Sequence, residues 1–263
     1  MSSMPQPTGH ERYLMKRGLC SIVMLCAALA LPFSAATASL SDSPKRTDML
    51  PETQEQPLTA QHKNMAIIAA RTAAGNLPGL NNALQQGLDA GLSISDCREI
   101  LVQLYAYAGF PRSLNALGEL MKVIDSRRAQ GIQDDEGRLP GPLPKPEEML
   151  AVGTKNQTAL VGKTVSGPLF GFAPAADAYL KTHLFGDIFS RDNLDWKSRE
   201  FATAGMLAAM PGTEPQLKAH LSMSMNVGVT QSQLSELVAF FMENDEQASA
   251  DRLQAALDSV LAG

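Results

Sequence analysis

Apolar residues recur at helical spacing along much of this chain, and nowhere do they alternate with polar residues as a half-buried strand requires. In the first half this pattern predicts four helices, over residues 65–74, 80–90, 93–107 and 112–128. Gly91 is expected to end the second helix. Ser93, with Asp96 three residues later, gives the third helix a start of the capping-box type.

A second run of helices is predicted after a linker. Residues 131–146 are rich in Gly and Pro and lack periodicity, so they are expected to connect two halves of the chain. Residues 173–189 are expected to form two short helices. Longer helices follow over residues 196–209, 214–226, 230–240 and 248–261, separated by Pro and Gly residues. The predicted fold class is therefore all-α.

The two halves repeat each other at one fixed offset. Moving the second half back by 137 positions (217 − 80) pairs Leu217 with Leu80, Pro215 with Pro78, Gly228 with Gly91 and Glu236 with Glu99. A self-match at one period without gaps indicates two copies of one supersecondary unit. We therefore predict a first unit over residues 61–130, a linker over 131–150 and a duplicate unit over 151–263.

One acid–base pair is found only in the second copy. Glu200 and His220 are expected on successive antiparallel helices, where they can meet across the hairpin, whereas the offset gives Lys63 and Ala83 in the first copy. A carboxylate beside an imidazole fixes its tautomer and suits it to proton transfer near neutral pH. The alternative is a structural bond that closes the hairpin.

The first copy carries polar residues that the second copy lacks. Tyr105, Tyr107, Arg112 and Asn115 correspond to Met242, Asn244, Ser249 and Arg252. We infer one site per chain, assembled between the two copies, with these four residues as substrate-binding candidates; the alternative is that they only pack. Arg112 lies at a helix start, an unfavourable place for a cation, which suggests an anionic partner. Arg199 can bind a substrate carboxylate bidentately, or remain solvated at a helix end.

The N-terminus has the features of a secretory signal. Lys16 and Arg17 precede an apolar run over residues 18–33, and an Ala-x-Ala site ends at Ala38. We predict a signal peptide over residues 1–38, with Met15 as a second candidate start, and a disordered lead-in over 39–60. The mature protein is then exported, periplasmic or secreted, without stable membrane insertion. An uncleaved anchor is the alternative.

Charge, cysteine content and histidine spacing argue against a nucleic-acid partner, a disulfide and a metal site. A net charge of −5 gives no reason to expect nucleic acid as a partner. Cleavage would leave Cys97 alone, without a disulfide partner. Cys97 lies in the first turn of a helix beside Arg98, which favours a reactive thiolate, although its counterpart Leu234 suggests a buried, inert thiol. The remaining histidines are dispersed, so no metal and no cofactor are expected.

Two segments resemble a known family. EILVQLYAYAGFPRSLNAL (residues 99–117) is similar to the second half of the carboxymuconolactone decarboxylase domain, and LDWKSREFATAGMLAA with LKAHLSMSMNVGVT (within residues 194–230) to its first half. The resemblance extends over residues 65–125 and 173–241. It implies an alkylhydroperoxidase-like all-α fold and a homo-oligomer, as dimer, trimer or hexamer. It also implies one of two activities, lactone decarboxylation or thiol-dependent peroxide reduction.

The peroxidase branch of this family resembles the pattern Glu-x11-Cys-x2-Cys-x3-His. Here the spacing from Glu200 to His220 is one residue longer, and the two cysteine positions fall on Thr213 and Gln216. The resemblance therefore implies acid–base chemistry rather than a disulfide mechanism.

The sequence thus predicts an exported, cofactor-free enzyme that acts on a small lactone or keto acid in an apolar pocket. A carboxy-lyase reaction would use Arg112 or Arg199 to hold the substrate carboxylate and His220 to move the proton, with Glu200 orienting the imidazole. Two alternatives remain: peroxiredoxin-type peroxide reduction through Cys97, and a non-catalytic helical oligomer or binding module.

Overall fold

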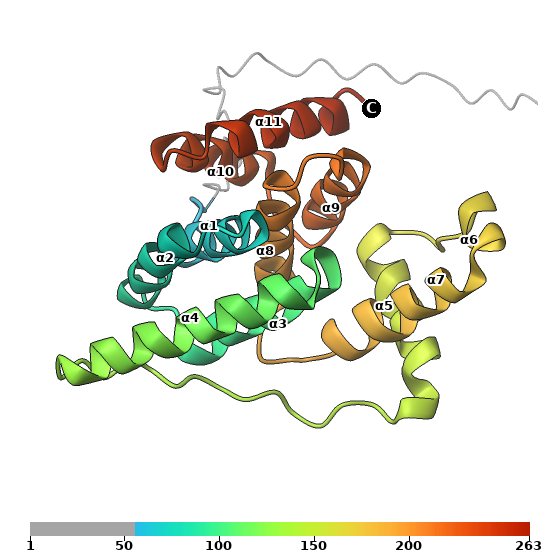
Figure 1. The fold of residues 1–263 in the computed structure, drawn as a ribbon. Helices are drawn as coiled ribbons and strands as arrows, with labels where there is room; N and C mark the ends of the chain where they lie inside the picture. The colour runs from blue at the N-terminus through green and yellow to red at the C-terminus, as the bar shows by residue number, and fades with distance from the viewer. Residues whose placement is uncertain (1–55) are drawn as a thin grey trace, which may run out of the picture. The chain divides into compact units, whose positions relative to one another are not determined.

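The computed structural model describes residues 56–263, which are helical and contain no strand (Figure 1). The all-α prediction is confirmed for this part of the chain. The predicted signal peptide, over residues 1–38, and residues 39–55 of the predicted lead-in lie outside the described residues. None of the described helices is long and apolar enough to cross a bilayer.

Four helices make up the first half of the described chain. They are α1 (Ala60–Ala74), α2 (Leu77–Asp89), α3 (Ile94–Ala108) and α4 (Phe110–Ala129). Three of them, α1, α2 and α4, start earlier than predicted. In α2 and α4 this is because Pro78 and Pro111 lie in the first turns instead of preceding the helices. Proline fits that turn because its missing N–H has no helical partner there. Asn76 completes the start of α2 by accepting a hydrogen bond from the Gly79 N–H.

The middle of the chain is more helical than predicted. After residues 130–145 come η1 (Pro146–Glu148), α5 (Met149–Val161) and α6 (Pro168–Phe172), none of which the sequence pattern indicated. The two short helices expected over residues 173–189 are α7 (Pro174–Tyr179) and η2 (Leu180–Ile188). η2 is a π-helix, a rare conformation that is frequent at functional sites.

The last four helices agree with the predicted bounds to within a few residues. They are α8 (Trp196–Ala208), α9 (Glu214–Asn226), α10 (Gln231–Glu243) and α11 (Gln247–Leu261). α9, α10 and α11 start 137 positions after α2, α3 and α4 respectively. Ser93 and Thr230, which are also 137 positions apart, both form capping boxes. The sequence repeat is therefore matched by a repeat in helix starts and caps.

The main core forms around α1 and α8, which pack against each other over most of their length (Figure 1). Ile67, Ile68 and Phe201 are buried at this contact. The two backbones approach so closely that a Cβ at Gly205 would overlap the carbonyl oxygen of Ala66. α8 also contacts α3 and α9, so this crossing fixes the helix that carries Glu200.

A second, smaller core lies between α5, η2 and α9. Leu160, Leu184, Phe185 and Met223 are buried there, and Tyr107 packs against them. α5 and η2 also cross in close contact, because a Cβ at Gly153 would overlap the carbonyl oxygen of Lys181. α5 also contacts α9, and residues of α5, η2 and α9, including His220, line one cavity.

Candidate active site

Glu200 of α8 and His220 of α9 meet across the hairpin, as predicted. Nδ1 of His220 donates a hydrogen bond of 2.8 Å to Oε2 of Glu200. Glu200 has no exposed surface, and His220 is 6% exposed. A carboxylate can only accept hydrogen bonds, so the pair fixes the proton on Nδ1 and leaves the lone pair of Nε2 available.

Tyr107 of α3 is the third member of this arrangement. Its hydroxyl lies 3.4 Å from Nε2 of His220, and the two rings meet edge-on with centroids 5.5 Å apart. Burial and the nearby charge of Glu200 raise the pKa of Tyr107 well above its usual range, so the hydroxyl keeps its proton. Glu200, His220 and Tyr107 therefore form a chain of hydrogen-bonding groups that ends in a proton donor.

Tyr107 and His220 both line a cavity of about 490 Å³. Its apolar wall is formed by Val161, Phe170, Leu180, Leu184, Phe185 and Met223. The other polar side chains at its surface are Gln157, Thr213 and Gln216. None of the lining residues is Asp, Glu, Lys or Arg. A cavity of this size with a few converging polar groups is typical of a small-molecule site.

Part of the cavity lining could not be found from the sequence. Gln157, Val161 and Phe170 come from α5 and α6, the helices that the pattern did not indicate. Thr213 and Gln216, in contrast, occupy the positions of the two family cysteines, and both lie at the cavity. The two positions that hold cysteines in the peroxidase-branch pattern thus lie at the same cavity as His220 but carry no thiol.

The second carboxylate oxygen of Glu200 has no hydrogen-bond partner within the described chain. Within residues 56–263, this carboxylate forms one ion pair, with His220. The negative charge of Glu200 is therefore available to stabilise a protonated imidazole.

The predicted role of Arg199 as a substrate clamp is wrong. Its side chain is fully buried and donates hydrogen bonds to Oε1 of Glu99, Oε1 of Gln103 and the carbonyl of Arg191, over 2.8 to 3.0 Å. Adjacent residues on a helix point in different directions, so Arg199 faces α3 while Glu200 faces α9. Burial lowers the pKa of Arg199, although Glu99 acts in the opposite direction.

Glu99 is the centre of a buried ionic cluster on α3. It accepts two hydrogen bonds from Arg191, one from Arg199 and one from Asn193. Burial by itself would raise the pKa of Glu99, but the bonds from Arg191 and the charge of Arg199 hold it below its ordinary value. This cluster joins α3, α8 and the loop before α8, and so fixes the helices that carry Tyr107 and Glu200.

Three of the predicted substrate-binding residues, Arg112, Asn115 and Tyr105, do not reach His220. Arg112 is exposed and lines a different cavity, with Ala74 and Met210, and Asn115 is exposed on α4. Tyr105 lies at a third cavity, where its ring stacks on Phe110 with centroids 4.3 Å apart. Tyr105 and Tyr107 are two positions apart on α3, so they point to different sides of the helix. Of the five predicted residues, Tyr107 is the one that joins Glu200 and His220.

Cys97 is not in the environment expected of a reactive thiol. Its side chain is fully buried, and burial, together with the charges of Asp96 and Asp134, raises its pKa to about 12. The predicted burial of this thiol is therefore confirmed, and the alternative of a thiolate activated by Arg98 is contradicted. Cys97 is also absent from the residues that line the His220 cavity.

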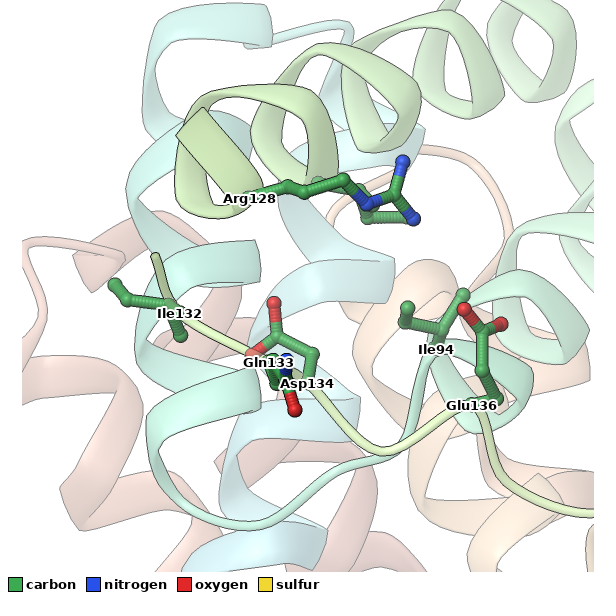
Figure 2. A pocket seen from close by; sticks show the side chains of 7 residues that line it. Ile94, Arg128, Ile132, Gln133, Asp134 and Glu136 are labelled. Carbon is green, nitrogen blue, oxygen red and sulfur yellow. The ribbon is translucent and has the colours of Figure 1, made fainter. Parts of the chain in front are cut away.

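A further cavity, of about 350 Å³, lies at the C-terminal end of α4 and contains none of the predicted site residues. Figure 2 shows Arg128 on one side of it, with Ile132, Asp134 and Glu136 along the following segment. Asp134 is already paired with Arg127 at 2.8 Å. Within residues 56–263, no group of three or more His, Cys, Asp or Glu side chains converges to hold a metal ion.

Residues 174–258 match the model of the Carboxymuconolactone decarboxylase family. The matched segment runs from α7 into α11 and includes Glu200 and His220 but not Tyr107. A comparison with curated proteins finds no match. The helical structure and the family match agree with the alkylhydroperoxidase-like fold that the sequence resemblance implies. The resemblance over residues 65–125 lies outside the match and stays a prediction.

Proposed function

We propose that this protein is a general acid–base enzyme that moves a proton on a small, neutral carbonyl compound of the lactone or cyclic ketone class. The observation that carries the proposal is the chain of Glu200, His220 and Tyr107, two members of which line an apolar cavity. General acid–base catalysis requires a proton acceptor and a proton donor placed beside the substrate. His220 and Tyr107 are placed in this way at the wall of the apolar cavity.

Each residue has a separate role in the proposed reaction. The Tyr107 hydroxyl donates a hydrogen bond to the substrate carbonyl oxygen, which it can do because its 3.4 Å contact with His220 is long and weak. Nε2 of His220, freed from Tyr107, removes a proton from the carbon next to the carbonyl. The electron pair moves onto the carbonyl oxygen, and Tyr107 stabilises the resulting enolate. Glu200 stabilises the imidazolium, which then returns the proton to a carbon of the enolate.

The cavity lining contains no charged Asp, Glu, Lys or Arg side chain, which favours a neutral substrate. The carboxy-lyase prediction relied on Arg112 or Arg199 as a carboxylate clamp, and neither lines the cavity. Transfer of a free carboxylate into an apolar space costs several kcal/mol unless a cation pairs with it. Decarboxylation is therefore a weaker candidate than proton transfer on an uncharged lactone or ketone.

The test uses α-angelica lactone, a neutral β,γ-unsaturated lactone, as probe. The relay would remove a proton from C3 and return one to C5, giving the conjugated isomer, which is followed by absorbance and by proton NMR in D2O. We expect the purified protein to accelerate isomerisation and deuterium uptake, and His220→Phe to abolish both. His62→Gln is the matched control, because His62 contacts Ser198 and Phe201, away from the cavity lining. Isomerisation that survives in His220→Phe would contradict the proposal.

Peroxide reduction through Cys97 is not proposed. It requires an accessible thiolate, and a buried thiol with a pKa of about 12 is neither accessible nor ionised near neutral pH.

We also propose that residues 61–130 and 151–263 are copies of one helical unit. The repeated helix starts of α2, α3 and α4 in α9, α10 and α11 support this origin. In the second copy the unit provides the Glu–His pair, and in the first it provides Tyr107. One relay per chain would then result from the loss of different residues in each copy.

We also propose that the protein is exported and forms a homo-oligomer. The basic start, apolar run and Ala-x-Ala site support cleavage after Ala38. The expected intact mass is that of a chain whose first residue is Ser39. Leu169 and Phe172 are 69% and 88% exposed, which supports a homo-oligomer. Light scattering coupled to gel filtration is expected to give a mass above that of one chain.

A further inference from the structure

A second histidine–carboxylate pair lies on η2, away from the Glu200–His220 pair. Nδ1 of His183 is 2.6 Å from Oδ2 of Asp187. Because the carboxylate can only accept, it fixes the proton of the neutral imidazole on Nδ1. Nε2 of His183 is buried and has no hydrogen-bond partner in the described chain. His183 therefore presents an unpaired hydrogen-bond acceptor.

The His183 side chain, which is 44% exposed as a whole, lines a cavity of about 460 Å³ between α3, α7 and η2. Three aromatic side chains line the cavity: Tyr105, Phe110 and Tyr179. The Tyr105 ring stacks on Phe110 and lies 5.4 Å, centroid to centroid, from the His183 ring. Phe110 and Tyr179 keep 60% and 73% of their surface exposed, so each ring retains surface that a ligand can contact.

The aromatic cavity is separate from the His220 cavity. Ala106, Leu180 and Leu184 line both of them, so these three residues form a shared wall. His183 and Tyr105 lie at one cavity, and His220 and Tyr107 lie at the other. The two histidines therefore serve different spaces.

The charges around His183 restrict the ligand. No Lys or Arg lines the aromatic cavity, and the ammonium of Lys181 is taken by Asp177 at 2.6 Å. Asp187 adds a negative charge next to His183 and would repel an anion. The unpaired Nε2 requires a donor from the ligand, since a buried acceptor without one is costly. Together these features select a neutral molecule with a flat apolar body and a hydroxyl group.

We propose that the aromatic cavity is a second ligand site that binds a small molecule of the phenol class. The ring of the ligand packs against Tyr105, Phe110 and Tyr179, and its O–H donates to Nε2 of His183. The proposal rests on the geometry of η2 and α3, and it is independent of the reaction proposed for His220.

The test is a fluorine NMR titration of the full chain with 4-fluorophenol and with 4-fluoroanisole, which has the same ring but no O–H. We expect 4-fluorophenol to bind about tenfold more tightly, as one hydrogen bond to a buried acceptor allows. In His183→Phe, which keeps an aromatic ring but loses Nε2, this preference should disappear. His62→Phe is the matched control and should keep it.

A second readout does not depend on the variant. In uniformly nitrogen-15-labelled protein, 4-fluorophenol should shift the Nε2 signal of one histidine ring, and that signal should be the one missing from His183→Phe or, if this variant does not fold, from His183→Gln. Three results would overturn the proposal: equal affinity for the two probes or none, a preference that survives in His183→Phe, or a shift at His220 or His62 instead of His183.

Discussion

The hydroxyl of Tyr107 lies 3.4 Å from Nε2 of His220, although 113 positions separate the two residues along the chain. Tyr107 comes from the half that lacks the Glu–His pair, and His220 comes from the half that lacks the tyrosine. The contact exists because α8 packs against both α3 and α9. A site distributed in this way depends on the packing between the halves as much as on the residues themselves.

Glu200→Gln should slow turnover of the lactone probe without unfolding the protein. The amide of glutamine can donate to Nδ1, which would place the imidazole proton on Nε2 and remove the base. We expect a fall in kcat of about 10²- to 10⁴-fold, the usual contribution of general acid–base catalysis. The exposed Glu243→Gln on α10 is the control and should keep full activity. Steady-state kinetics and urea unfolding are measured for both variants. A Glu200→Gln variant that keeps full activity would exclude the proposed relay.

Tyr107→Phe should separate binding from catalysis. The ring keeps its place in the second core, so KM for α-angelica lactone should change little. The hydroxyl that stabilises the enolate is lost, so kcat should fall by about 10²- to 10³-fold. Stability should stay nearly constant, since the bond to His220 is long. A variant that raises KM and leaves kcat unchanged would show that Tyr107 only binds.

The sequence predicted most of the fold because the relevant signals are local. α9 has the predicted bounds, since Pro215 and Gly228 lie beside its ends. α5 was missed because its apolar residues alternate irregularly with Thr, Lys and Asn and give no clear stripe. The direction of a side chain is not a local property, so the pairing of Arg199 with Glu99 could not be predicted. The same limit applies to the part of the cavity wall that comes from α5 and α6, which carry none of the predicted site residues.

Acid should destabilise the protein through Glu99. Its pKa is lowered in the folded state, so its contribution to stability is present above the unfolded pKa of about 4.3 and is lost as pH falls through the folded pKa. Glu99→Gln leaves two arginines facing an amide and should cost about 3–5 kcal/mol at pH 7. Urea unfolding between pH 7 and pH 3 checks both statements. The difference between wild type and variant should shrink at the acidic end; a constant difference would contradict the assigned role.

Gly205→Ala should destabilise the α1–α8 crossing. The added Cβ would overlap the carbonyl of Ala66, which is backbone and cannot move without separating the helices. We expect a loss of about 3 kcal/mol or more. Gly118→Ala is the matched control, because nothing lies within 4 Å of a Cβ at that position of α4. There the better helix propensity of alanine should raise the free energy of unfolding by up to about 1 kcal/mol. Equal melting temperatures for the two variants would argue against close packing at Gly205.

Cys97 should be inert in the folded protein. The thiol is fully buried and its pKa is raised to about 12, so neither an organic hydroperoxide nor a disulfide reagent should modify it at pH 7. In urea the same reagents should react with Cys97. Intact mass before and after treatment gives the answer, with Cys97→Ser as control. Rapid oxygen addition under native conditions would restore the peroxidase alternative.

The segment between α4 and η1 is mostly exposed and contains no helix, and it divides the relay between two pieces of chain. A protein opened at this point would carry Tyr107 on one polypeptide and Glu200 with His220 on the other. Lactone turnover would then appear only when the two fragments associate, and at low concentration its rate would follow the product of their concentrations. The split protein would then serve as a complementation assay, in which any lactone turnover reports how strongly the two halves bind each other.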